Sequence, residues 1–181
     1  MKQSFKMIFS LCLIALISAV ILAKVYMITQ PAIIANEKKA TENAIYKVVN
    51  TATSYKESKS GQTDIFKCYD ENNKFCGLAF VAEGVGYQDL IKVMVGVSTD
   101  FNKILAIEVI ENSETPGLGN KIVTPWFENQ FQNLSLQNKI TVVKVAPSKD
   151  SEIQAITGAT ISSQAVVDII NNKIEELKGY K

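Results

Sequence analysis

A run of small and hydroxyl-bearing residues near the C-terminus has the composition of a phosphate-binding turn. The run contains Thr157, Gly158, Ala159, Thr160, Ser162 and Ser163. An apolar-periodic segment predicts a helix that begins near Ser163, and a helix N-terminus offers unpaired N–H groups and a partial positive charge to a phosphate. Gly158 and Ala159 have little side chain, so the backbone can approach an anion closely. The alternative is that the hydroxyls of Thr160, Ser162 and Ser163 only cap the helix.

A second group, residues 113–121, has the composition of a loop that can hold a planar, polar ligand. It reads Ser113, Glu114, Thr115, Pro116, Gly117, Leu118, Gly119, Asn120, Lys121. Gly117 and Gly119 allow backbone geometry that lets amides point at such a ligand. Glu114 and Thr115 can add side-chain contacts, and Lys121 can offset the charge of a phosphate. An ordinary Pro-Gly turn after a strand is the alternative.

The two motifs together resemble the signatures of the FMN-binding domain that the G subunit of the Rnf electron-transport complex shares with the C subunit of the sodium-pumping NADH:quinone oxidoreductase. In that family the last threonine of the first motif, Thr160 here, carries FMN through a phosphoester bond. The second motif closes around the flavin. The resemblance therefore implies a cofactor site made of Thr160 with Thr157, Gly158, Ala159, Ser162, Ser163, Glu114, Thr115, Gly117, Leu118, Gly119 and Lys121.

Two further segments carry the same resemblance. Residues 86–93 look like the family's glycine-tyrosine segment, although Gln88 stands where a second glycine is expected. Residues 124–131 resemble the short aromatic helix that follows the flavin loop. We expect Tyr87 and Trp126 to be core aromatic residues rather than residues that stack on a flavin.

The resemblance also implies a function, an electron relay through covalent FMN within an ion-translocating ferredoxin:NAD oxidoreductase of the Rnf type. No independent active site is evident, so the chain is expected to be an electron-carrier subunit. Its expected partners are other membrane subunits, the lipid bilayer and a flavin transferase that attaches the cofactor. The equivalent quinone-reductase subunit, a stand-alone extracytoplasmic flavoprotein or sensor, and a flavin-free interaction protein remain alternatives.

The N-terminal segment predicts a membrane anchor. Residues 7–23 are apolar apart from two serines and a cysteine, and the segment extends past Lys24, enough for a helix to cross the hydrocarbon core. A cleaved signal peptide is disfavoured because the segment is long and lacks a clear small-x-small site. Lys2 and Lys6 precede it, which predicts a cytoplasmic N-terminus and an extracytoplasmic C-terminal domain in a single-pass protein of the cytoplasmic membrane.

The remaining pattern predicts an α+β domain of antiparallel strands with flanking helices. We expect an anchor over residues 1–30, a stalk helix over 31–58 after a break at Pro31, and an FMN-binding domain over 59–181. Expected strands cover residues 63–68, 75–82, 91–97, 104–110 and 140–145. The terminal helix places Val166, Val167, Ile170, Ile174 and Leu177 on one face.

Composition excludes several other classes of chemistry. The chain has no histidine, which excludes a histidyl-linked flavin, a histidine-ligated haem and a Ser-His-Asp triad. The 3 cysteines lack the spacing of a zinc or iron–sulfur site. Cys68 and Cys76 flank a predicted hairpin turn, so a disulfide can form in an oxidising exterior. A net charge of +1 gives no indication of nucleic-acid binding, and FMN is the only redox centre that the sequence suggests.

Overall fold

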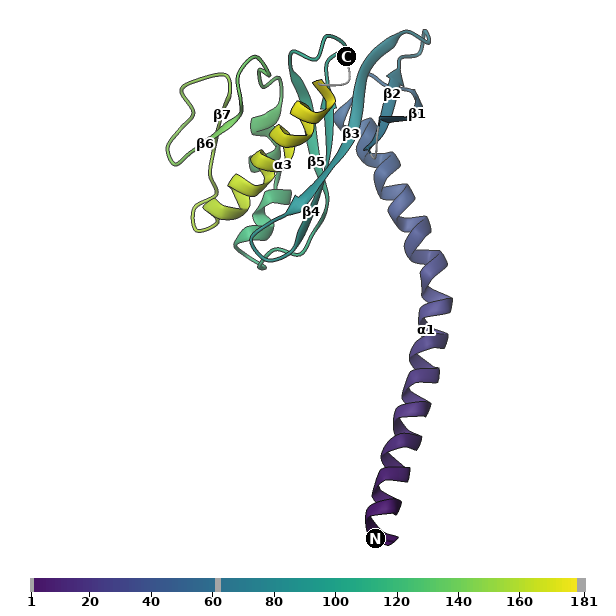
Figure 1. Cartoon of the computed structure of the whole chain (residues 1–181). Coiled ribbons are helices and arrows are strands. Elements are labelled where there is room, and N and C mark those ends of the chain that lie inside the picture. Colours follow the sequence, from purple (N-terminus) through teal and green to yellow (C-terminus); the bar gives the residue numbers. More distant parts are fainter. Residues whose placement is uncertain (1, 61–62, 179–181) are drawn as a thin grey trace. The chain divides into compact units, whose positions relative to one another are not determined.

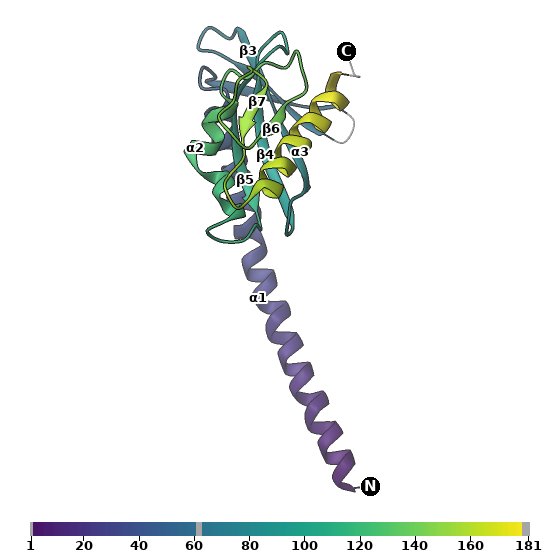
Figure 2. The ribbon, with the colours of Figure 1, turned by 90° about the vertical axis from the view of Figure 1, so that its left-hand side faces the viewer.

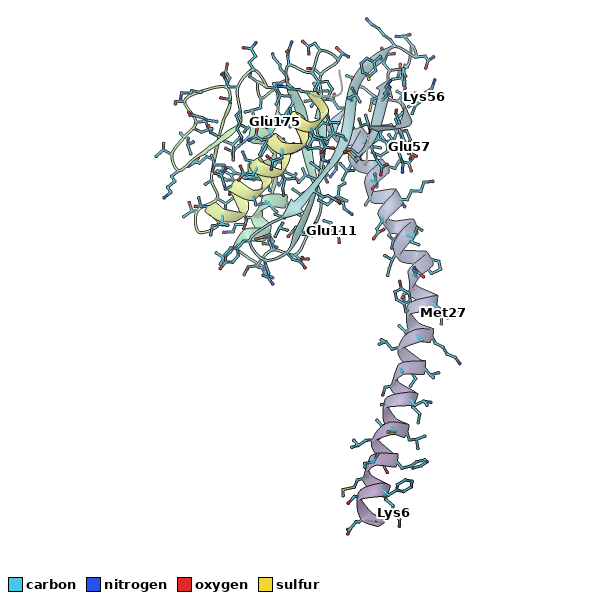
Figure 3. The ribbon with its side chains drawn as sticks, viewed as in Figure 1. Lys6, Met27, Lys56, Glu57, Glu111 and Glu175 are labelled. Atoms are coloured by element: carbon cyan, nitrogen blue, oxygen red, sulfur yellow. The ribbon has the colours of Figure 1, made fainter. Side chains whose placement is uncertain are left out.

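The computed structural model describes residues 2–60 and 63–178, which form two compact units, Met1–Ala40 and Thr41–Lys181. The first unit is the greater part of one long helix, α1 (Lys2–Val48). This helix is long and apolar enough to cross a membrane, and its large apolar side chains from Phe5 to Ile34, Met27 among them, are exposed (Figure 3). These are the properties of a segment that lipid covers.

The segment expected to be a separate stalk differs from the prediction. α1 continues through Pro31 without a break, since a proline within a long helix removes one hydrogen bond and leaves the others. The helix then ends at Val48, and Ser54–Ser60 forms a strand, β1, which the sequence analysis assigned partly to the helix. The strand is polar because it lies at the edge of the sheet, where only Tyr55 packs inward on the core.

The second unit is built on a five-stranded antiparallel sheet in the order β1-β2-β3-β4-β5. The strands after β1 are β2 (Thr63–Tyr69), β3 (Phe75–Val85), β4 (Leu90–Val97) and β5 (Ile104–Asn112). All four contain the strands expected from the sequence. This arrangement confirms the α+β class, with antiparallel strands and flanking helices (Figure 1).

The sheet is covered on both faces along β4, because successive side chains of a strand point to opposite faces and β4 is apolar at nearly every position. On β4, Val93, Val95 and Val97 belong to the larger core, which includes the C-terminal helix α3 (Thr160–Lys178). Met94 points to the opposite face and packs with Ile45 from the last turns of α1. Figure 2 shows α3 and the short helices on the same side of the sheet.

Short elements connect β5 to α3. The 3-10 helix η1 (Gly119–Val123), α2 (Pro125–Glu128) and the 3-10 helix η2 (Asn129–Phe131) follow the second motif. Phe127 and Phe131 are buried there with ring centroids 5.5 Å apart, which matches the expected aromatic helix. Strands β6 (Thr141–Val143) and β7 (Glu152–Gln154) pair in parallel. The expected strand over 140–145 is therefore shorter and joins no antiparallel sheet.

The two domain cysteines lie on one face of the β2–β3 hairpin. Cys68 is opposite Gly77, and an extra residue on β3 at this point forms a β-bulge that leaves Cys76 beside the pair. Both residues contact the core formed with the end of α1. They are free thiols in this structure, and burial raises the pKa of Cys68 to about 11. A disulfide between them remains a prediction.

Candidate functional site

Thr160 lies where the first motif meets α3. The chain leaves β7, turns at Gly158 with a φ of 82°, and enters the helix at Thr160. That φ is in the left-handed region, which glycine adopts without the steric penalty of a Cβ. The side chain of Thr160 is exposed, and its hydroxyl has no hydrogen-bond partner within residues 2–60 and 63–178. It is therefore free to carry a substituent.

The first turn of α3 has the properties of an anion site. The N–H of Ser163 bonds to the carbonyl of Ala159 at 3.1 Å, which closes the first helical hydrogen bond. The N–H groups of Thr160, Ile161 and Ser162 have no partner in the described part of the chain. Unpaired donors at a helix start, with the positive end of the helix dipole, stabilise a phosphate.

Two other hydroxyls of the motif, those of Ser162 and Ser163, form hydrogen bonds inside the protein. The Ser163 hydroxyl donates to the carbonyl of Ala159 and accepts from the N–H of Ile156, both at 3.0 Å. The Ser162 hydroxyl donates to a carboxylate oxygen of Glu114 at 2.6 Å. Both serines are buried. Neither hydroxyl accepts from an N–H of the first turn of α3, so the expected capping role is wrong for these two serines.

The second motif forms a tight loop that ends in η1. The carbonyl of Thr115 accepts from the N–H groups of Leu118 and Asn120, each at 3.2 Å. The N–H of Gly117 donates to the side chain of Asn120 at 2.9 Å, and its φ is 77°. These three amides are used within the loop, whereas the N–H of Gly119 has no partner in the described part of the chain. The expected contact between loop amides and a ligand therefore stays a prediction for Gly119.

The structure brings the two motifs together around one cavity. The cavity has a volume of about 260 Å³ and is lined by Tyr87, Glu114, Thr115, Leu118, Gly119, Gly158, Ala159, Thr160, Ile161 and Ser162. A second, larger groove of about 700 Å³ runs from the end of β3 along α3 and shares Thr160 and Ile161 with the first. Thr160 is therefore on the rim of both.

Four of the residues expected at the site lie outside the lining of the smaller cavity. They are Thr157, Gly117, Ser163 and Lys121. Thr157 is exposed in the turn, and Lys121 is exposed on η1 without an ion pair in the described ranges. The structure gives no contact through which Lys121 offsets a phosphate, so that role stays an expectation.

Three residues, Tyr87, Gln88 and Ile161, have a larger part in the site than expected. Tyr87, 64% exposed, lines the cavity, and Trp126 is 54% exposed, so neither is a core aromatic residue. Gln88, the departure from the family pattern, accepts a hydrogen bond from the Thr115 hydroxyl at 3.1 Å. A glycine at this position cannot provide that bond. Ile161 is exposed beside Thr160 and lines both cavities, and its apolar side chain at an exposed helix start was the available signal in the sequence.

Comparison with known proteins identifies this arrangement. The FMN-binding domain family matches residues 86–175, a range that contains both motifs and all residues that line the smaller cavity. The G subunit of the ion-translocating oxidoreductase complex of Methanosarcina acetivorans is 29% identical over 96% of this chain and 94% of its own length. The G subunit of the proton-translocating ferredoxin:NAD(+) oxidoreductase complex of Clostridium ljungdahlii is 31% identical over 94% of this chain and 90% of its own length.

The chain belongs to the family of G subunits of ion-translocating oxidoreductases. Solved structures agree on the fold: NqrC of Shewanella oneidensis superposes with a TM-score of 0.57 at 20% identity, over 70% of this chain and 67% of the other. The C subunit of the sodium-translocating NADH-quinone reductase of Vibrio alginolyticus is 36% identical, but over 46% of this chain and 35% of its own length. The match to the G subunits extends over nearly the whole chain, including α1.

The residues present in this member of the family fit an FMN group. The free hydroxyl of Thr160, the unpaired N–H groups beside it and the adjoining cavity meet the needs of a phosphoester and of a ring beyond it. Within residues 2–60 and 63–178, no group of three or more His, Cys, Asp or Glu side chains is arranged to hold a metal ion. The site therefore combines a free hydroxyl at a helix start with a partly apolar cavity.

Proposed function

We propose that this protein relays electrons through an FMN attached to Thr160, within an Rnf-type ion-translocating ferredoxin:NAD oxidoreductase. One observation carries the proposal. The exposed, unpaired hydroxyl of Thr160 stands at the first turn of a helix and on the rim of the cavity that both motifs form. A flavin accepts electrons singly or in pairs, which suits a relay between one-electron carriers.

The chain's own residues would hold the cofactor from two sides. The N–H groups of Ile161 and Ser162 lie at the helix start, where they would stabilise the phosphate. Leu118 and Ile161 provide apolar walls, and Thr115 provides a polar group on the cavity wall. A tether prevents loss of FMN by diffusion from an extracytoplasmic domain. It also leaves the ring unmodified, so the surrounding residues set its redox properties.

Attachment would require a separate flavin transferase. The Thr160 hydroxyl has no hydrogen-bonded base within the described residues, and the chain has no histidine. A threonine hydroxyl is a weak nucleophile unless a base or a metal activates it. The family resemblance implies an extracytoplasmic enzyme that uses FAD with a divalent metal, and expression without that enzyme should give a protein without covalent flavin.

The test is in-gel flavin fluorescence after denaturation of the full chain co-expressed with a flavin transferase. The wild type should fluoresce, and Thr160→Val should show no band although the protein is expressed and folded. Thr141→Val is the matched control because it removes an exposed threonine hydroxyl from β6, outside both motifs, and it should keep the fluorescence. Fluorescence of the Thr160→Val band would show that the attachment residue is wrong.

The alternative within the same fold is the corresponding component of a sodium-pumping quinone reductase. The 36% identity to the Vibrio alginolyticus protein favours this candidate over unrelated functions. The proteins that copurify with the chain separate the two. Ferredoxin:NAD oxidoreductase components are expected, and NADH-quinone reductase components would contradict the Rnf assignment.

A further inference from the structure

Glu114 is a buried carboxylate at the centre of the site, and its oxygens are already bonded to protein. The residue is 4% exposed. One carboxylate oxygen accepts from the N–H of Tyr87 at 2.7 Å and from the N–H of Gln88 at 3.1 Å. The other accepts from the hydroxyl of Ser162 at 2.6 Å. A side chain held in this way links segments of the protein to each other.

Those partners belong to different parts of the fold. Tyr87 and Gln88 are in the turn between β3 and β4, which is closed by a 2.8 Å bond from the N–H of Gly86 to the carbonyl of Asp89. Ser162 is in the first turn of α3, and Glu114 itself follows β5. One carboxylate therefore joins three segments that are distant in sequence and that together line the cavity beside Thr160.

Two glycines make room for this carboxylate. A Cβ at Gly119 would be 2.5 Å from one carboxylate oxygen and 2.7 Å from the Ser162 hydroxyl. A Cβ at Gly86 would overlap the other oxygen. Such distances are far below van der Waals contact, so both positions exclude a side chain while Glu114 is in place. Gly119 thus serves the carboxylate, in contrast to Gly117, around which an added Cβ meets open space.

Glu114 is buried without a cationic partner in the described part of the chain. No lysine forms an ion pair with Glu114 among residues 2–60 and 63–178. Its burial is compensated by backbone N–H groups and a hydroxyl, and charge-assisted bonds of this kind are roughly twice as strong as neutral ones. They are also directional, so they fix the geometry of the groups that donate them.

We propose that Glu114 is a positioning residue, whose carboxylate holds the turn at residues 86–89 against the first turn of α3 and so fixes the walls around the flavin. The part of this inference that concerns the flavin rests on the proposed function. The link between the three segments does not depend on it. Glu114 was expected from the sequence to contact the cofactor. The geometry instead gives it an indirect role, since its oxygens are directed at Tyr87, Gln88 and Ser162.

The first test uses the flavin-free protein, so it does not depend on cofactor attachment. Amide hydrogen exchange is measured on the full chain in the Thr160→Val background, alone and with Glu114→Ala or Glu114→Gln. The amides of Tyr87 and Gln88 should exchange several-fold faster with alanine. Glutamine should restore protection, because its amide oxygen can accept both bonds and its NH₂ can donate to Ser162. Glu111→Gln, which removes an exposed carboxylate from β5 (Figure 3), should change nothing.

The second test uses the flavin-loaded chain, after in-gel fluorescence has shown that the tether is present. Iodide quenching of the flavin should increase several-fold in Glu114→Ala, and the flavin midpoint potential should shift toward that of free FMN. Glu114→Gln should stay close to the wild type in quenching. If the alanine variant does not fold, Ser162→Ala removes one of the three bonds and should give an intermediate effect.

Three results would overturn the inference. They are unprotected Tyr87 and Gln88 amides in the parent protein, wild-type exchange in Glu114→Ala, and a glutamine variant that behaves like alanine, which would assign the effect to charge. Absence of covalent flavin in the wild type would contradict the proposed function instead. The two failures are therefore distinguishable.

Discussion

At the scale of single residues, the buried hydroxyls of the first motif form hydrogen bonds inside the protein and the exposed ones do not, within the described residues. Ser162 and Ser163 are buried and use their hydroxyls inside the protein, whereas Thr160 is exposed and unpaired within the described ranges. Sequence alone gives these residues equal standing because all are hydroxyl-bearing residues at a helix start. The three hydroxyls differ only through their positions on the helix and through the hydrogen bond from Ser162 to Glu114, which follows β5.

A second residue, outside the site, is expected to couple stability to pH. Burial raises the pKa of Glu128 to about 7, and nearby Glu108 adds to the rise, while the N–H of Val109 and the charge of Lys47 oppose it. The folded state therefore holds this proton more tightly than the unfolded chain, whose pKa is 4.5. The stabilisation is complete below pH 4.5 and is lost as pH rises through 7.

Glu128→Gln should remove this pH dependence. The variant should match the wild type near pH 4.5 and exceed it at pH 8 by about 1–2 kcal/mol, allowing for partial solvation. Urea unfolding at both pH values measures the difference, with Glu111→Gln as an exposed control. A constant difference between wild type and Glu128→Gln across this range would contradict the assignment.

At the scale of elements, the end of α1 is part of the folded domain. Ile45 is 0% exposed and belongs to the core that includes Met94 of β4. An added Cβ at Gly96 would collide with the backbone of Val48, so this glycine permits the close approach of helix and strand. The domain core therefore extends upstream of residue 59, the start of the domain expected from the sequence.

Ile45→Ala should destabilise the domain by about 2–5 kcal/mol, the usual cost of truncating a fully buried isoleucine. Ile34→Ala is the control, because Ile34 is on the same helix and 57% exposed, and it should leave domain stability unchanged. Thermal unfolding of the full chain in detergent, followed by tryptophan fluorescence, measures both. Equal effects of the two substitutions would mean that the end of α1 does not pack on the sheet.

Much of the sheet was predictable because its strands alternate or are continuously apolar. The strands at 63–68, 75–82, 91–97 and 104–110 follow directly from that pattern. β1 was not predictable, since Ser54–Ser60 is polar and owes its conformation to pairing with β2. The parallel pairing of β6 with β7 depends on a contact between two segments that a loop separates. The local sequence pattern of either segment does not indicate such a contact.

The site was predictable as two motifs but not in its internal bonding. Family resemblance indicated that residues 113–121 and the turn before α3 belong together, and one cavity joins them. The link made by Glu114 could not be predicted, because it depends on the distances between three separate segments. The exposure of Tyr87 was missed for a related reason: an aromatic side chain in a turn shows no periodicity that indicates its burial.

At the scale of the whole molecule, the chain combines a membrane segment with a flavin-binding domain. Within the described residues, one helix of sufficient length and apolarity begins before the domain, and its large apolar side chains from Phe5 to Ile34 are exposed. The related G subunits match over nearly all of the chain, including this helix. Lys2 and Lys6 precede the apolar stretch, so we expect the N-terminus in the cytoplasm and the domain outside.

Cysteine labelling in intact cells tests this orientation. In a background with Cys12, Cys68 and Cys76 replaced by alanine, Glu71→Cys should react with a membrane-impermeant maleimide. Lys6→Cys should react only after lysis. Both positions are exposed in the structure, so access depends on the side of the membrane. The reverse pattern would place the domain in the cytoplasm, where an extracytoplasmic transferase could not modify it.

The central claim is that FMN is esterified to Thr160, and peptide mass spectrometry tests it most directly. Trypsin should release residues 150–173 from the protein made with a flavin transferase, because no lysine or arginine lies between Lys149 and Lys173. The peptide should carry the mass of one FMN less one water, and fragmentation should place it on Thr160. An unmodified peptide, or FMN on Thr157, Ser162 or Ser163, would contradict the account.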